Sequence, residues 1–278
     1  MLKFFRNIRK TLLQEGKTTN YLKYAIGEII LVVIGILIAL QINNWNENRK
    51  EEENLQNYLV NLKEALNNDI ISLESTITFN KTRLKGIFYI LEHAHLNTQT
   101  FTEMAWIDVS KNDSLNQIWK APYPNSINHE FTNLAFSIIG RGFGGASYNK
   151  SVINELYSTG TFSNIQNLNL KTKIGDYYSY LSKRLEGYAI EEHEQWANET
   201  TRFFRDKYGI LTLDVSDIEN PFDVLKGQKD VENYLRYLAL EVNYHCIWAA
   251  EAKAIAMDLV DLIESEVKTN KKLIIIYD

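Results

Sequence analysis

An uninterrupted apolar run is the strongest pattern along the chain. Residues 25–40 read AIGEIILVVIGILIAL and contain one charged side chain, Glu28. As an α-helix, the segment from Tyr24 to Trp45 would be roughly 31 Å long, which matches the hydrocarbon thickness of a bilayer. These two aromatic residues border the run where interfacial aromatic side chains are enriched. The pattern predicts a transmembrane helix over residues 24–42.

Beyond residue 43, apolar positions recur at the three- and four-residue spacing of amphipathic helices. The predicted helices cover residues 47–95, 126–139, 148–158 and 167–208, and a coiled-coil-like heptad seam runs from Val231 to Ile263. We expect a loop over residues 96–125 and a helix stop at Gly209. Residues 269–278 fit a membrane-interface segment, a short strand or a partner-binding segment. The predicted fold class is all-α, a transmembrane helix continuing into an up-down, four-helix-bundle-like extracytoplasmic domain.

Charge differs on the two sides of the predicted span. Residues 1–23 contain six Lys or Arg residues and one acid, whereas residues 43–53 contain four Glu residues and two bases. Because positively charged flanks stay in the cytoplasm, we expect residues 1–23 there and residues 43–278 on the other side of the membrane. Residues 2–13, LKFFRNIRKTLL, fit a basic amphipathic helix on the lipid bilayer, with a disordered positive tail as the alternative.

Small side chains line one face of the predicted span. Gly27, Leu31, Gly35 and Ala39 recur every four residues, and small residues at this spacing are typical of packed transmembrane helices. Glu28 lies beside this face, and a carboxylate inside a span is costly enough to suggest a function. We expect this face to contact another transmembrane helix. The alternative is a lipid-facing stripe with a glutamate that reaches the headgroups.

The composition favours a packed helical domain and excludes one class of partner. Three prolines and thirteen glycines in 278 residues are typical of long uninterrupted elements. The net charge is −5 although residues 1–23 are basic, so the remainder is acidic and nucleic acid is not expected as a partner. Cys246 is the only cysteine, which excludes an intramolecular disulfide and favours a buried apolar role.

The search for catalytic or cofactor chemistry yields no complete motif. Residues 140–145, GRGFGG, satisfy G-x-G-x-x-G, but no strand–helix–strand unit or following acid accompanies them. We expect a hinge there, with an anion-binding concavity around Arg141 as the alternative. His193 and Glu194 begin an H-E-x-x-H motif, but Ala197 replaces the second ligand. We therefore expect no enzyme, no cofactor and no metal.

Two groups of residues are candidates for binding or titration. The loop over residues 96–130 carries several aromatic side chains suited to a binding tip, or equally to a cap over the end of the bundle. These candidate residues are Trp106, Trp119, Tyr123, His129 and Arg141. His245 lies on the heptad seam one turn after Glu241, so a buried imidazole near a carboxylate could titrate near neutral pH, and a hydrogen-bonded core histidine is the alternative.

Three stretches resemble one family. They are KYAIGEIILVVIGILIALQINNWNENRK at residues 23–50, the opening LKFFRNIRKTLL, and INELYSTGTFSNIQN at residues 153–167. Together they are similar to an uncharacterised family of single-pass membrane proteins from Bacteroidota, with a domain of unknown function. The resemblance implies an inner-membrane protein with a periplasmic domain, and it implies no activity, ligand or catalytic residue.

These observations favour two functions. The first is a membrane-anchored envelope interaction or scaffold protein, which binds a membrane or envelope protein, or a second copy of itself, through its helical domain and transmembrane face. The alternative is a periplasmic helical bundle that senses a small-molecule ligand and signals through a partner membrane protein. The sequence identifies neither the ligand nor the partner.

Overall fold

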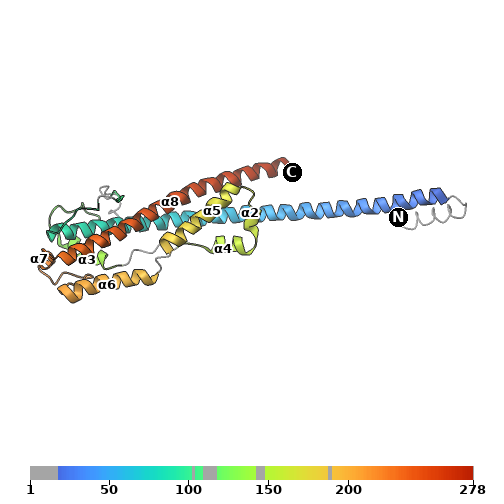
Figure 1. Cartoon of the computed structure of the whole chain (residues 1–278). Helices are drawn as coiled ribbons and strands as arrows, with labels where there is room; N and C mark the ends of the chain where they lie inside the picture. The colour runs from blue at the N-terminus through green and yellow to red at the C-terminus, as the bar shows by residue number, and fades with distance from the viewer. Residues whose placement is uncertain (1–17, 102–103, 109–117, 142–147, 187–189, 278) are drawn as a thin grey trace. The chain divides into compact units, whose positions relative to one another are not determined.

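The computed structural model describes residues 18–101, 104–108, 118–141, 148–186 and 190–277, and helices are the regular secondary structure there. No strand occurs in those ranges, so the all-α prediction is confirmed for them. Figure 1 shows the elements in order. They are α2 (Thr18–His93), α3 (His129–Ile139), α4 (Ser151–Ser158), the 3-10 helix η2 (Thr161–Asn164), α5 (Leu168–Leu181), the π-helix η3 (Ser182–Glu186), α6 (Ile190–Tyr208), α7 (Pro221–Leu225) and α8 (Lys229–Tyr277).

The chain divides into two compact units, Met1–Asn57 and Tyr58–Asp278, and α2 contributes residues to both. In the first unit, α2 contains a segment long and apolar enough to cross a membrane. Its large apolar side chains from Ile26 to Ile42 are each 47 to 63% exposed. The segment is therefore a candidate membrane span, as the apolar run predicts.

In the second unit, α8 packs antiparallel to the part of α2 that follows Tyr58 (Figure 1). Lys63 pairs with Glu264 at 3.2 Å, and Lys253 pairs with Glu74 further along both helices. The heptad prediction is confirmed on α8, where every predicted seam position is buried. Those positions are Val231, Leu235, Leu238, Val242, His245, Ala249, Ala252, Ala256, Leu259 and Ile263. The three alanines lack bulk beyond Cβ, which lets neighbouring helices approach closely.

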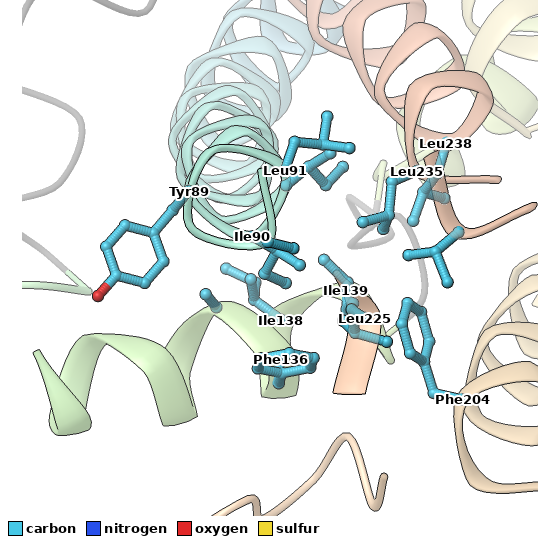
Figure 2. Close-up of a cluster of buried hydrophobic side chains, with 14 of the residues drawn as sticks. Tyr89, Ile90, Leu91, Phe136, Ile138, Ile139, Phe204, Leu225, Leu235 and Leu238 are labelled. Carbon is cyan, nitrogen blue, oxygen red and sulfur yellow. The ribbon is translucent and has the colours of Figure 1, made fainter. Parts of the chain in front are cut away.

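Five helices meet in one hydrophobic core at the end of the second unit that carries α3 and α7 (Figure 2). The core side chains come from α2, α3, α6, α7 and α8. They include Tyr89, Ile90, Leu91, Phe136, Ile138, Ile139, Phe204, Leu225, Leu235 and Leu238. Because short α3 and α7 are held by this shared core, the loops that precede them are fixed at the same end of the unit.

The single helix expected over residues 167–208 is divided. The α-helix α5 ends at Leu181 and the wider π-helix η3 follows it, while α6 begins at Ile190 and residues 187–189 lie outside the described ranges. Single π turns inside helices are rare and frequent at functional sites. Arg184 of η3 lies over the ring of Trp248 of α8 at 5.2 Å, and this contact anchors the turn to the seam helix.

The helix stop predicted at Gly209 is confirmed. Gly209 has a φ of +67°, a conformation that glycine adopts without a steric penalty. Its N–H donates to the carbonyl of Arg205 at 3.0 Å, and the N–H of Ile210 donates to that of Phe204 at 3.1 Å. These two bonds satisfy the last carbonyls of α6. At the other end of the chain, α8 remains helical to Tyr277, so residues 269–277 are not a strand.

Candidate functional site

An open cleft of about 720 Å³ lies between the start of α3 and the segment that leads into α7. Two asparagines build its walls by capping the two helices. Asn128 Oδ1 accepts the N–H of Phe131 at 2.9 Å, and Asn220 Oδ1 accepts the N–H of Phe222 at 3.1 Å. Pro221 follows as the first residue of α7, where its missing N–H costs no hydrogen bond. The sequence thus starts both helices beside the cleft.

Tyr89 of α2 supports the wall of this cleft from below. Its ring packs edge-on against Phe131 at 4.8 Å and against Phe222 at 5.7 Å, so it contacts the first turn of each short helix. Its hydroxyl accepts the N–H of Asn128 at 2.8 Å. Figure 2 shows the Tyr89 hydroxyl pointing away from the other labelled core side chains. The cleft is therefore built on the hydrophobic core and not on a free loop.

The aromatic residues of the predicted binding loop pack against the protein. Trp119 and Tyr123 lie 5.1 and 5.3 Å from Phe131. Trp106 lies 6.1 Å from Phe88, and its Nε1 donates to the carbonyl of Phe101 at 3.2 Å. These contacts have the geometry of a cap over the end of the unit, the alternative that the sequence left open.

His129 and Arg141 occupy opposite ends of α3. His129 is exposed, begins the helix and lines the cleft. Arg141 is also exposed and follows Gly140 after the helix ends. Twelve residues of helical rise separate them by roughly 18 Å, so the structure does not bring these two predicted binding residues together. The rest of the glycine cluster, residues 142–145, lies outside the described residues.

The cleft is acidic and its carboxylates form no ion pair in the described part of the chain. Glu219 and Asp223 both line it and are both exposed. Asp223 accepts a hydrogen bond from Asn220 Nδ2 at 2.8 Å, which is its only charge-relieving contact among the described side chains. The surrounding segment, residues 211–225, contains four acids and no Lys, Arg or His. The negative charge at the cleft is thus not neutralised by the residues that form it.

A second hollow, which Val224 of α7 also lines, shows the opposite arrangement. It is lined by Lys207, Tyr208 and Asp230, among others. Lys207 pairs with Asp230, and the Tyr208 hydroxyl donates to Asp230 Oδ1 at 2.6 Å. These two donors lower the pKa of Asp230 to about 2, while burial and the same carboxylate raise the pKa of Tyr208 to about 12. The carboxylate of this hollow is therefore satisfied within the chain.

The sequence did not identify a buried arginine at the other end of α3. Arg83 of α2 is fully buried, and its Nη2 donates to the carbonyl of Ile139 at 3.0 Å. This carbonyl belongs to the last residue of α3, where the helix dipole favours a positive charge. Burial lowers the pKa of Arg83 to about 9. In the sequence, the only indication that Arg83 is buried was its position on the same helical face as Ile87 and Ile90.

Gly140 follows the last residue of α3 beside this arginine, and a larger residue has no room there. A Cβ at this position would lie 2.5 Å from Thr212 Oγ1 and 3.1 Å from Thr212 Cβ. The glycine therefore permits a close approach between the end of α3 and the chain that follows α6. This is a packing role for the first glycine of the cluster, for which the sequence predicted a hinge.

Asp69 of α2 joins three segments of the second unit. The carboxylate is 1% exposed. Its Oδ1 accepts the N–H of Asn149 at 3.2 Å, and its Oδ2 accepts the hydroxyl of Tyr177 at 2.9 Å. Burial raises the pKa of Asp69, with a smaller contribution from the charge of Glu186, although the two hydrogen bonds act in the opposite direction. A buried acid thus connects α2 to α5 and to the segment before α4.

The remaining predicted residues lie as follows. His245 is 3% exposed and its ring packs edge-on against Trp248 at 5.3 Å. Cys246 is buried as predicted, and its thiol lies 3.7 Å from the carbonyl of Ile77.

On the apolar segment of α2, Gly27 and Gly35 face open space, because a Cβ at either position would meet nothing within 4 Å.

The other residues of the predicted small-residue face are partly or largely exposed. Leu31 is 61% exposed and Ala39 is exposed, while Glu28 is partly buried. Within the described ranges of the chain, no group of three or more His, Cys, Asp or Glu side chains is placed to hold a metal ion.

Comparison with known families gives a match over part of the chain. Residues 28–133 match a family of unknown function (DUF6090). This range begins within the apolar segment of α2 and ends in the first turns of α3, so it includes Tyr89, Asn128 and His129. It agrees with the resemblance to an uncharacterised family over this part of the chain. No curated protein and no solved structure matches the chain.

Proposed function

We propose that this chain is a membrane-anchored interaction protein of the cell envelope. Residues 24–42 span an inner membrane with the N-terminus in the cytoplasm, and the Tyr58–Asp278 unit lies in the periplasm as a four-helix-bundle-like domain. There it binds a protein partner, and the small-residue face of the span contacts another transmembrane helix. The proposal assigns no catalytic activity.

The observation that carries the anchor is the exposure of the apolar segment. Twelve large apolar side chains between Ile26 and Ile42 are about half exposed or more. In a bilayer they would contribute about 4 to 7 kcal/mol in favour of insertion, from the 0.3 to 0.6 kcal/mol that each Ile, Leu or Val supplies. Leaving these side chains in water is unfavourable by that amount, so the segment needs an apolar environment. Its length fits the hydrocarbon core of a bilayer.

Two features support the orientation and the interaction role. Six of the seven charged residues in 1–23 are basic, which favours retention in the cytoplasm. Gly27 and Gly35 have open space in front of them, so this face of the helix is available to a neighbouring backbone. In the second unit, the structured α3–α7 cleft offers a recessed polar surface for a partner.

The anchor is tested by placing charge in the span. The double variant Ile34→Lys/Leu37→Lys replaces two favourable side chains with two lysines, each costing about 2.5 to 3.5 kcal/mol at the helix centre. The total cost is as large as the whole insertion free energy, so the variant should be extracted from membranes by alkaline carbonate. The matched control, Val60→Lys/Ile71→Lys, adds the same charge at exposed positions of the second unit and should stay in the membrane fraction.

The helix contact is tested by single cysteines at Gly35 and Ala39 in intact membranes. Disulfide or bifunctional crosslinks to a second copy or to another membrane protein are expected from this face, and not from the matched controls Val33→Cys and Leu37→Cys. Crosslinks that form equally from all four positions, or from none, would remove the transmembrane contact from the proposal and leave the anchor intact.

A further inference from the structure

We propose that the α3–α7 cleft binds a basic peptide segment, in which a Lys or Arg side chain lies beside an apolar residue. This inference rests on the proposed function, since it states the chemistry of the partner that the second unit binds. The cation would lie between Glu219 and Asp223, and the apolar residue would contact Ile127 and Ile218 on the rim and wall of the cleft.

The charge of the cleft is the first reason. Two carboxylates at spacing i, i+4 face the same hollow, and the chain supplies no Lys or Arg to its lining. Three other carboxylates of the second unit, those of Glu264, Glu74 and Asp230, each have a lysine partner. The negative charge of the cleft is therefore available to a cation from another molecule.

Residues of α7 also line the second hollow, since Val224 belongs to that hollow and Pro221, Phe222 and Asp223 belong to the cleft. In one, Asp230 is held by Lys207 and Tyr208, and its pKa is lowered to about 2. In the other, the side-chain amide of Asn220 is the only donor to the Asp223 carboxylate among the described residues. A lysine or arginine from a partner would complete in the cleft the arrangement that Lys207 completes in the hollow.

The apolar side chains of the cleft are the second reason, because they select an amphipathic ligand over a bare inorganic cation. Ile127 is 47% exposed, and Ile218 is half-buried beside it in the lining. The described residues place no set of three metal-ligating side chains there. A volume of about 720 Å³ fits a few amino-acid residues. An organic cation with an apolar neighbour therefore matches the lining better than a metal ion does.

Preorganisation is the third reason. The cleft-lining residues are fixed by the caps Asn128 and Asn220 and by the Tyr89 ring beneath them. Phe222 is 1% exposed and part of the core, so α7 does not need to form on binding. A binding surface that is already ordered loses little conformational entropy when a peptide docks.

The test uses the full-length protein in detergent micelles and a fluorescein-labelled peptide of sequence GLKLKG, with GLELEG as the charge control. Fluorescence polarisation should show saturable binding of the lysine peptide and none of the glutamate peptide. Raising the salt concentration from about 50 to 500 mM should weaken binding, because the contacts are solvent-exposed ion pairs.

Variants locate the site. Glu219→Gln/Asp223→Asn should weaken binding roughly two- to thirtyfold, the range for two exposed ion pairs. Its control, Asp258→Asn/Asp261→Asn, makes the same change in net charge at exposed positions of α8 and should bind as the unaltered protein does. Ile127→Ser should weaken binding, and Ile71→Ser on α2 should not.

The outcomes separate this inference from the proposed function. Equal weakening by both carboxylate pairs would mean that net charge alone attracts the peptide, which overturns the cleft as a site. Absence of binding by a protein that remains membrane-anchored and crosslinks through Gly35 would overturn the basic-peptide inference alone. A protein extracted by carbonate that still binds the peptide through Glu219 and Asp223 would overturn the anchor and keep the cleft.

Discussion

Replacing Asp69 by asparagine tests how the buried acid contributes to the second unit. Asparagine has the same shape, and its Oδ1 can accept the N–H of Asn149 while its Nδ2 donates to the Tyr177 oxygen. The variant therefore keeps a hydrogen bond to each partner, although the one to Tyr177 is reversed and its phenol proton loses this acceptor, and it removes a charge that burial disfavours. We expect Asp69→Asn at neutral pH to be within about 1 kcal/mol of the unaltered protein or more stable than it.

Asp69→Ala provides the contrasting perturbation. It leaves the buried Tyr177 hydroxyl without its acceptor, which costs about 1 to 3 kcal/mol, and it adds a smaller cost at Asn149 because that residue is exposed. The expected loss is about 2 to 4 kcal/mol. For a unit of this size that corresponds to a fall in Tm of about 4 to 16 °C.

The pH dependence of the free energy of unfolding tests the role of the Asp69 carboxylate in the most detail. Its pKa is raised above the ordinary 3.8 in the folded protein, so the native state binds this proton more tightly than the unfolded state does. Its contribution to stability is complete below 3.8 and is lost as the pH rises through the raised value. The stability difference between Asp69→Asn and the unaltered protein should therefore grow in favour of the variant over that window and stay constant above it.

Thermal unfolding of the full-length protein in detergent, followed by tryptophan fluorescence at several pH values, measures these effects. Four of the five tryptophans, at 106, 119, 196 and 248, belong to the second unit, and a Trp45→Phe background removes the signal of the first unit. If Asp69→Asn were as unstable as Asp69→Ala at neutral pH, the ionised carboxylate would be essential to the fold, and the reasoning from its burial would be refuted.

Three further predictions follow from particular contacts. Gly140→Ala should destabilise the second unit by about 1 to 3 kcal/mol through its clash with Thr212, and Thr212→Ala should partly restore the urea midpoint; an additive loss in the double variant would contradict this. Asp230 has a pKa lowered to about 2, so its contribution is present above 3.8 and is lost as the pH falls through 2; acid titration should show Asp230→Asn and the unaltered protein converging there. Ala252→Leu should destabilise the unit by about 1 to 3 kcal/mol or more by overpacking the seam, whereas Ala254→Leu at an exposed position should change its Tm little.

The sequence predicted those parts of the fold that depend on regular spacing. The heptad from Val231 to Ile263 is buried at every position because a repeat near 3.5 residues keeps one face of a helix toward its neighbour. Gly209 was predictable as a helix stop because few other residues adopt a positive φ cheaply. The apolar segment from Ile26 to Ile42 stands out by composition alone.

Features that depend on long-range contacts could not be read from the sequence. Arg83 lies 56 residues from the carbonyl that it binds, and Asp69 lies 108 residues from Tyr177. No local pattern marks such pairs, because their geometry follows from how α2 packs against α3 and α5. The π-helix η3 was missed for a related reason, since its residues, SKRLE, have ordinary helical propensity.

The candidate site was partly predictable. His129 was identified as a candidate, and it does line the cleft. Glu219 and Asp223 were not, because exposed acids have no distinguishing spacing until α3 and α7 are brought to the same end of the core. Trp119 and Tyr123 have the aromatic composition of a binding tip, but their rings pack against Phe131.

The central claim is that residues 24–42 hold the second unit outside the cytoplasm, and cysteine labelling in spheroplasts tests it most directly. The background is low because Cys246, the only cysteine, is buried. Asp258→Cys at an exposed position of α8 should react with a membrane-impermeant maleimide in intact spheroplasts, whereas Lys10→Cys should react only after permeabilisation. Labelling of Lys10→Cys and protection of Asp258→Cys before permeabilisation would contradict the proposed orientation, and labelling of neither would place the second unit in the cytoplasm.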